Sequence, residues 1–80
     1  MELKANIFQE MIDKQKGANS IWRFQEWHNF KNNLNPSERS QFESVMKELC
    51  DTGYFTQEQQ NGGVYLFRLT KFGSEKIYQN

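Results

Sequence analysis

The segment Asn35–Phe55, NPSERSQFESVMKELCDTGYF, decides the fold because it contains a helix start, one apolar stripe and a helix stop in that order. Asn35 suits the cap that accepts hydrogen bonds from the free amides of a first helical turn, and Pro36 suits the first helical position. Glu38 stands three residues after the cap, which is the spacing of a capping box. Gly53 stands where helices commonly end on a left-handed residue. The segment therefore predicts one helix with both of its ends marked.

The helix predicted over residues 36–51 has one apolar side and one polar side. At about 100° per residue, its apolar side chains fall within an arc of roughly 100°. These side chains are Phe42, Val45, Met46 and Leu49. The opposite side carries Ser37, Ser40, Gln41, Ser44, Lys47, Glu48 and Asp51. We expect the apolar side to be buried and the polar side to be available to a partner.

The length and composition are those of one small domain spanning residues 1–80. Aromatic residues make up 15% of the chain and compensate for an apolar content of 36%, because each ring buries a large area. Cys50 is the single cysteine, so no disulfide can form within the chain, which indicates a reducing compartment. No apolar run approaches the roughly 20 residues that span a bilayer, and the charged N-terminus does not read as a signal peptide. We expect a cytoplasmic protein without a membrane partner.

The formal charge of the chain is zero, from ten lysines and arginines against ten aspartates and glutamates. A balanced charge weighs against a protein that coats nucleic acid through broad electrostatic attraction. It leaves room for a local basic face, because affinity for a duplex depends on the few cations that reach phosphates.

The N-terminal residues predict another helix. From residue 2 to residue 16, apolar residues recur at helical spacing over about half of the helix circumference, so we expect this helix to touch two neighbours. Lys14 and Lys16 fall in its predicted last turn, where cations complement free carbonyl groups. Gly17 follows as the predicted stop.

The next residues predict a short extended piece and a second helix. Residues 20–24 fit either a short strand or the first turn of a longer helix, and we favour the short extended piece. Trp27, Phe30 and Leu34 keep helical spacing, which predicts a helix over residues 25–32. Three asparagines before Pro36 then favour a turn. Two helices joined by a turn of about four residues have the spacing of a helix-turn-helix pair.

The C-terminal third predicts a hairpin and a closing helix. Residues 54–57 and 64–69 read as strands, and the polar turn between them contains Gly62 and Gly63, which tolerate positive φ. Thr70 is the predicted cap of the closing helix. In that helix Phe72 and Ile77 are the expected apolar contacts, and Gly73 permits close approach to the hairpin.

This order of helix, short strand, helix, turn, helix, hairpin and closing helix is that of a winged helix-turn-helix domain. Over nearly its whole length the chain resembles small bacterial and phage winged-helix proteins. The end of their recognition helix is similar to LCDTGYF, at residues 49–55. Their last wing strand, with the leucine-threonine and glycine segment after it, is similar to YLFRLTKFGSEKIY, at residues 65–78. The resemblance implies an α+β fold with a three-helix core, a β-hairpin wing and a short C-terminal helix.

The resemblance also implies that the helix at residues 36–51 enters a DNA major groove, with its N-terminal half nearest the base edges. The candidate contacts are Ser37, Arg39, Ser40, Gln41, Ser44 and Lys47. Arginine and glutamine can read guanine and adenine edges, and serine is a short donor to phosphate or base. The same helix carries four acidic residues against two basic ones, a balance of minus two. The alternative is therefore a solvated face, or one that meets a protein partner.

Two further groups of residues are candidates for DNA contact. The glutamine-rich wing could lie along a minor groove, or it could be a solvated turn. Its candidates are Gln57, Gln59, Gln60 and Asn61. Four basic residues could flank the recognition helix and contact phosphates, or they could be scattered surface cations. These are Arg23, Lys31, Arg68 and Lys71.

An aromatic cluster precedes the central helix, and a domain this small needs such rings in its core. Its members are Trp22, Phe24, Trp27, His28 and Phe30. Two other interpretations stay open: stacking on single-stranded bases, and a partly exposed Trp22 that contacts a partner or a second copy of the chain.

No constellation of residues predicts catalysis or metal binding. His28 and Cys50 are too few for a structural zinc site, which takes four ligands. Cys50 flanks the apolar stripe, where a half-buried and inert thiol is expected. We therefore expect no enzyme, no metal and no cofactor. The sequence predicts a small DNA-binding module that serves as a transcriptional regulator or accessory protein. The alternative is a protein–protein interaction module on the same scaffold. Whether the chain forms a homodimer stays open.

Overall fold

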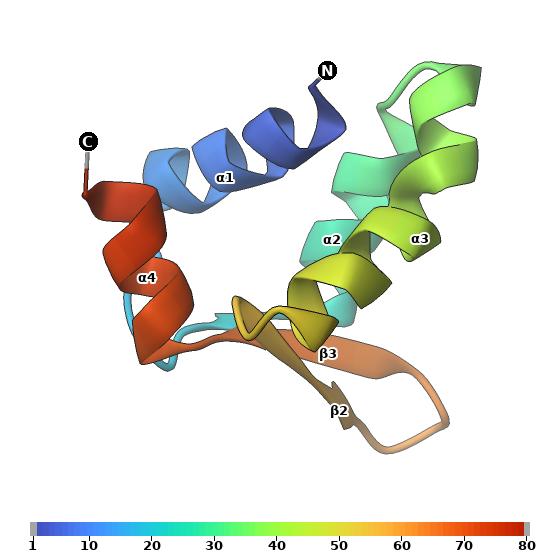
Figure 1. The fold of residues 1–80 in the computed structure, drawn as a ribbon. Coiled ribbons are helices and arrows are strands. Elements are labelled where there is room, and N and C mark those ends of the chain that lie inside the picture. Colours follow the sequence, from blue (N-terminus) through green and yellow to red (C-terminus); the bar gives the residue numbers. More distant parts are fainter. Residues whose placement is uncertain (1, 80) are drawn as a thin grey trace.

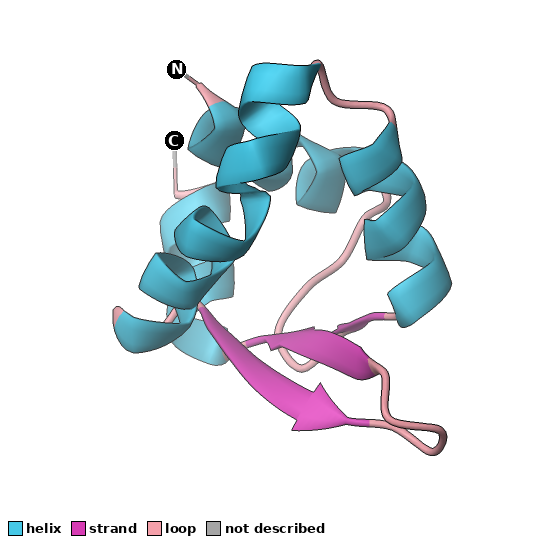
Figure 2. Cartoon of the chain, turned by 90° about the vertical axis from the view of Figure 1, so that its right-hand side faces the viewer, coloured by secondary structure: helices cyan, strands magenta, loops and turns pink. Residues whose placement is uncertain are grey.

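The computed structural model describes residues 2–79, which form an α+β fold of four helices and one three-stranded antiparallel sheet. The order of elements is the one expected from the sequence. The elements are α1 (Leu3–Asp13), β1 (Ile21–Trp22), α2 (Phe24–Asn32), α3 (Pro36–Asp51), β2 (Phe55–Gln59), β3 (Tyr65–Leu69) and α4 (Lys71–Tyr78). All four helices lie on one side of the sheet, and the apolar core fills the space between them (Figure 1, Figure 2).

Helix α3 begins and ends at the residues that the sequence marked. The Asn35 side-chain oxygen accepts a hydrogen bond from the Glu38 amide at 2.8 Å, and Pro36 is the first helical residue. At the other end Gly53 has φ +90°, and the Gly53 and Tyr54 amides donate to the carbonyls of Cys50 and Leu49. These two bonds form a Schellman motif, which satisfies carbonyl groups that the helix leaves free. Both predicted ends of α3 are confirmed.

Helix α1 is shorter than predicted, because Gln15 rather than Gly17 takes the left-handed conformation. Gln15 has φ +56°, and its amide donates to the Ile12 carbonyl at 3.0 Å. The Lys16 amide donates to the Met11 carbonyl at 2.9 Å, so this end is also a Schellman motif. The helix thus ends at Asp13, and the prediction that its last turn contains two lysines is wrong. As expected, α1 packs against two neighbours, α3 and α4.

The short extended piece after α1 is confirmed as β1, and α2 begins at Phe24, one residue earlier than predicted. Three residues, 33–35, separate α2 from α3, which is a normal length for a turn between paired helices. Trp27 is buried on α2, while Phe30 and Leu34 are half-buried against the core.

The sheet has the order β1-β3-β2, and the hairpin runs from Phe55 opposite Leu69 to Gln59 opposite Tyr65. Strand β2 is longer than predicted, because Glu58, which the sequence placed in the turn, pairs with Leu66 across the strands. The tip is therefore shorter, at residues 60–64. There Gly62 and Gly63 have φ +88° and +84°, as their place in a tight turn predicts.

Helix α4 closes the fold against the start of the hairpin. The Thr70 hydroxyl oxygen accepts a hydrogen bond from the Gly73 amide at 2.9 Å, which confirms the predicted cap. Gly73 packs against the backbone of Tyr54, as expected from its lack of a side chain. Ile77 is buried, and Phe72 makes its expected apolar contact as an edge-to-face pair with Tyr54, although 46% of its surface stays exposed.

The core is built around Trp22, which has no exposed surface and is surrounded by Phe30, Phe42, Phe55 and Phe67. A side chain enclosed in this way cannot contact a partner, so the interpretation of Trp22 as an interface residue is wrong. Base stacking on Trp22 is excluded for the same reason. The core side of α3 is as predicted, with Phe42, Met46 and Leu49 buried and Val45 half-buried.

Candidate nucleic-acid interface

The polar side of α3 is open to solvent along its whole length. All six candidate contacts on this helix are exposed: Ser37, Arg39, Ser40, Gln41, Ser44 and Lys47. The helix has 16 residues and is therefore about 24 Å long. Its apolar side fixes the orientation, because Phe42, Met46 and Leu49 retain 2% or less of their surface exposed. Burial of the apolar side thus orients the candidate face toward solvent.

Lysines on and beside this face are paired with acids of the same molecule, and its arginine is bonded to a backbone carbonyl. Lys47, 78% exposed, forms an ion pair with Asp51 at 3.1 Å. Lys31 on α2 pairs with Glu43 on α3 at 2.5 Å, so this predicted phosphate contact is occupied by a carboxylate. The Arg39 guanidinium donates to the Leu34 carbonyl at 3.0 Å, across the turn between the helices. The face therefore presents hydroxyls, amides and neutralised pairs rather than a concentration of positive charge.

The predicted wing residues divide between strand β2 and the hairpin tip. Gln57 and Gln59 lie on β2 and are exposed. Gln57 is opposite Phe67, which faces the core, so both side chains lie on the helix side of the sheet. Gln60 and Asn61 lie at the tip, where the Gln60 amide donates to the Val64 carbonyl. Of this group, the structure brings Gln57 next to α3.

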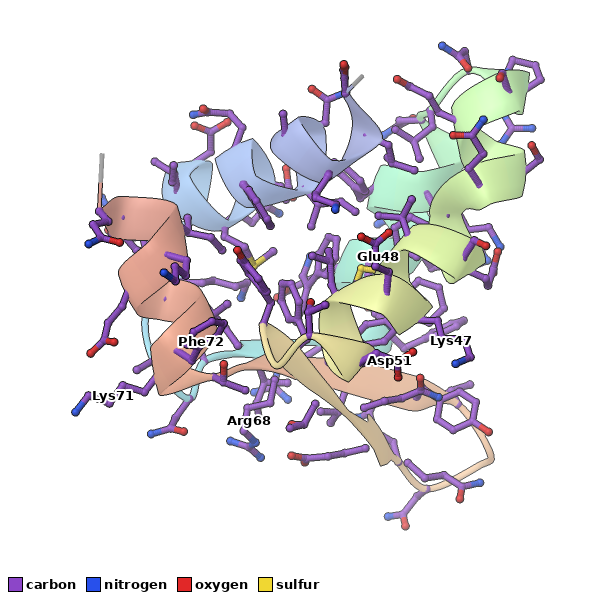
Figure 3. All side chains as sticks on the ribbon, in the orientation of Figure 1. Lys47, Glu48, Asp51, Arg68, Lys71 and Phe72 are labelled. Atoms are coloured by element: carbon purple, nitrogen blue, oxygen red, sulfur yellow. The ribbon has the colours of Figure 1, made fainter. Side chains whose placement is uncertain are left out.

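The four predicted phosphate contacts do not lie on one face. Arg68 alternates along β3 with buried Phe67 and Leu69, so its side chain is on the sheet face that turns away from the helices. Lys71 is exposed at the start of α4, and Figure 3 shows both residues well apart from Lys47. Arg23 is exposed immediately before α2. Lys31 contacts α3 through its pair with Glu43.

Arg68 and Glu58 form a separate charged cluster on that outer sheet face. The Arg68 guanidinium donates two hydrogen bonds to the Glu58 carboxylate, at 2.7 and 3.1 Å, and a third to the Asn19 carbonyl. These bonds hold the pKa of Glu58 below its ordinary value and raise the pKa of Arg68. Arg68 therefore stabilises the hairpin and the loop before β1.

A groove of about 410 Å³ lies between α3 and the hairpin, beside the candidate face. Its floor is apolar and consists of Trp27, Phe42, Met46 and Phe67. Its rim consists of Glu43 and Lys47 on α3, and of Gln57 and Tyr65 on the hairpin. The Trp27 indole nitrogen donates to the Tyr65 carbonyl at 2.9 Å, which fixes the hairpin to α2 beside the groove. This groove was not predicted from the sequence, because no local pattern joins residues from α2, α3 and both strands.

The cysteine and the histidine are in ordinary environments. Cys50 is half-buried, and burial together with the charge of Asp51 raises the pKa of its thiol. His28 stacks on Phe24 and lies 3.3 Å from the Asn32 amide nitrogen. Among residues 2–79, no three histidine, cysteine or acidic side chains are placed to share a metal ion.

Comparisons of the chain with protein-family models, with curated protein sequences and with solved structures found no match. Within the described residues, no helix combines the length and the apolar character needed to cross a membrane.

Proposed function

We propose that this chain is a winged helix-turn-helix module that binds double-stranded DNA and serves as a small regulator or accessory protein. In this proposal α3 enters the major groove, and the hairpin of β2 and β3 is the wing. A helix of about 24 Å with short polar side chains fits a major groove about 12 Å wide.

The observation that carries the proposal is the division of α3 into a buried side and a fully exposed side. Three of the exposed side chains are serines, which are short and can donate hydrogen bonds, so the helix backbone can approach the base edges closely there. Ser40 and Ser44 are one turn apart, and Lys47 follows on the same side. The order of elements around this helix, with a three-residue turn before it and a hairpin after it, also agrees with such a module.

The ion pair of Lys47 does not exclude a contact with phosphate. Asp51 is 64% exposed, and an exposed pair of this kind contributes only about 0–1 kcal/mol. Lys47 can therefore exchange Asp51 for a phosphate oxygen at little cost. We expect the remaining acids of α3 to keep affinity for random duplex low, and we expect the phosphate contacts to make that affinity fall with added salt.

Fluorescence anisotropy with a labelled random duplex tests the proposal. At about 50 mM salt we expect saturable binding, and the logarithm of the affinity should fall linearly with the logarithm of the salt concentration. Lys47→Glu should weaken binding about tenfold or more and reduce the salt slope by about one.

Lys76→Glu on α4 is the matched control, because it makes the same change in net charge on another element. Binding by this variant should stay within about twofold of the unmodified protein after correction for the small change in net charge. Equal losses in both variants would show that α3 is not the contact surface. Absence of binding at tens of micromolar protein and about 50 mM salt would refute DNA binding.

A protein–protein interaction module that uses the same face of α3 is the second candidate, and the ion pairing favours it. At least six of the ten basic residues pair with acids of residues 2–79, so few cations are free for phosphates. The pairs are Lys4–Glu48, Lys14–Glu10, Lys16–Glu26, Lys31–Glu43, Lys47–Asp51 and Arg68–Glu58. A protein interface does not require a cationic surface. The anisotropy titration separates the two candidates, since only the first predicts binding to duplex.

A further inference from the structure

We propose that the groove between α3 and the hairpin binds an uncharged, flat aromatic compound. The groove has a volume of about 410 Å³, which lies within the range of small-molecule sites. It is open to solvent along its rim, while its floor belongs to the aromatic core, so a compound can enter without unfolding the domain.

The shape and chemistry of the floor favour a flat ring. The Trp27 and Phe42 rings are nearly parallel, with centroids 5.7 Å apart and planes at 14°, and Phe67 meets Trp27 edge to face at 5.5 Å. Met46 adds a polarisable thioether, which makes favourable contacts with aromatic rings. Tyr65 is 43% exposed and provides an aromatic wall on the hairpin side. Trp27, at 9%, is the most exposed ring of the floor, so an aromatic compound can pack against its open edge and against the Tyr65 ring.

The charges at the rim favour a neutral compound over an ion. Glu43 is held by Lys31 at 2.5 Å, and Lys47 is held by Asp51 at 3.1 Å, so both rim charges are already compensated. A charged compound would lose hydration against the apolar floor and would have to displace one of these pairs. The Gln57 amide and the Tyr65 hydroxyl remain at the rim as neutral donors and acceptors, which suit one or two polar groups on the compound.

Occupation of the groove has a consequence that rests on the proposed function. Lys47 and Gln57 form part of the rim and are also candidate contacts with DNA. A bound compound would restrict both side chains and fill the space between α3 and the wing. We therefore expect the compound and the duplex to compete, so that the groove acts as a site for a small effector.

The test compares two probes with the same ring system, neutral 2-naphthol and anionic 2-naphthoate, by NMR titration of the isotope-labelled chain without DNA. We expect 2-naphthol to give saturable shifts of the amide signals of residues 42–47, 57 and 65–67, with a dissociation constant on the order of 10⁻³ M or lower. We expect 2-naphthoate to bind at least about tenfold more weakly. Amides of α1 and α4 should not move.

Two variants and a control locate the site. Tyr65→Ala removes the aromatic wall, and Gln57→Trp fills the groove from an exposed position. Each should weaken 2-naphthol binding about tenfold or more. Phe72→Ala removes a ring of similar exposure on α4, outside the groove, and should leave the affinity within about twofold.

Several outcomes would overturn the proposal. They are an absence of saturation by about 5 mM 2-naphthol, equal or tighter binding of 2-naphthoate, and shifts centred on α1 and α4. The proposed DNA binding and the proposed groove site can each be refuted without the other. A chain that binds 2-naphthol but no duplex keeps the groove and refutes the proposed function, and a chain that binds duplex but no 2-naphthol does the reverse.

Discussion

Gly73→Ala tests whether α4 packs on the backbone of the hairpin as closely as the structure indicates. A methyl group built at Gly73 lies 2.9 Å from the Tyr54 Cα and carbonyl carbon, and closer still to the carbonyl oxygen. These are backbone atoms, so no side-chain rotation relieves the contact. The Tyr54 backbone is also held in place, because the Thr70 amide donates to its carbonyl at 3.0 Å and the Thr70 hydroxyl donates to the Gly53 carbonyl at 2.5 Å.

The magnitude follows from two opposing terms. Overpacking typically costs about 1–3 kcal/mol, and a clash with fixed backbone belongs at the upper end of that range. Alanine in place of glycine inside a helix raises the free energy of unfolding by about 0.5–1 kcal/mol, because an alanine loses less conformational freedom on folding. The net loss in the free energy of unfolding is therefore about 2 kcal/mol. For a domain of this size that lowers Tm by roughly 8–16 °C.

Two other glycines serve as controls in the same thermal and urea unfolding experiments, followed by circular dichroism. Gly17 has open space around it and no positive φ, so Gly17→Ala should be neutral or stabilise by up to about 1 kcal/mol. Gly62 also has open space but has φ +88°, so Gly62→Ala should cost about 1 kcal/mol through the backbone alone. If Gly73→Ala is as stable as the unmodified chain, the close approach of α4 to Tyr54 is wrong.

Three further predictions concern the core and the titratable groups. Phe42→Ala should cost about 3–5 kcal/mol in urea unfolding, because the ring is 1% exposed and packs among aromatic side chains. The Cys50 thiol should react with iodoacetamide more slowly than a free cysteine at pH 8, because burial and Asp51 raise its pKa. The pKa of Glu58, measured by NMR, should lie below its ordinary value of 4.5. Since its folded pKa is lowered, the Arg68 pair contributes stability above the unfolded pKa and loses it as the pH falls through the folded pKa.

Each of these predictions has a clear contrary result. A change under about 0.5 kcal/mol for Phe42→Ala would mean that the wrong side of α3 had been assigned to the core. Alkylation of Cys50 at the rate of a free thiol would contradict its half-buried position. If Arg68→Gln left the pKa of Glu58 unchanged, their hydrogen bonds would not be the cause of its shift.

The sequence predicted the parts of the fold that local chemistry determines. The cap at Asn35, the proline after it and the left-handed Gly53 each act within one turn of the chain, and all three are confirmed. The helical spacing of the apolar residues likewise identified the buried side of α3. The end of α1 was misplaced because Gln15 accepts positive φ there, at a cost that two Schellman hydrogen bonds offset.

Features that depend on distant residues could not be read from the sequence. The ion pairs Lys4–Glu48 and Lys31–Glu43 join separate helices, so the compensation of charge on α3 appears only in the fold. Strand β2 reaches Gln59 since Glu58 is held by Arg68 on the neighbouring strand. The groove is assembled from three regions of the chain. Four of its eight lining residues were recognisable as aromatic, but the surface that the eight share was not.

An NMR titration of the labelled chain with a random duplex at low and at high salt tests DNA binding by α3 most directly. If α3 and the wing bind DNA, the amide signals of residues 37–47 and 57–61 should shift at about 50 mM salt and return to their free positions at about 500 mM. Shifts confined to α1 and α4, or no shifts at either salt concentration, would contradict the claim that the exposed side of α3 is a surface for DNA.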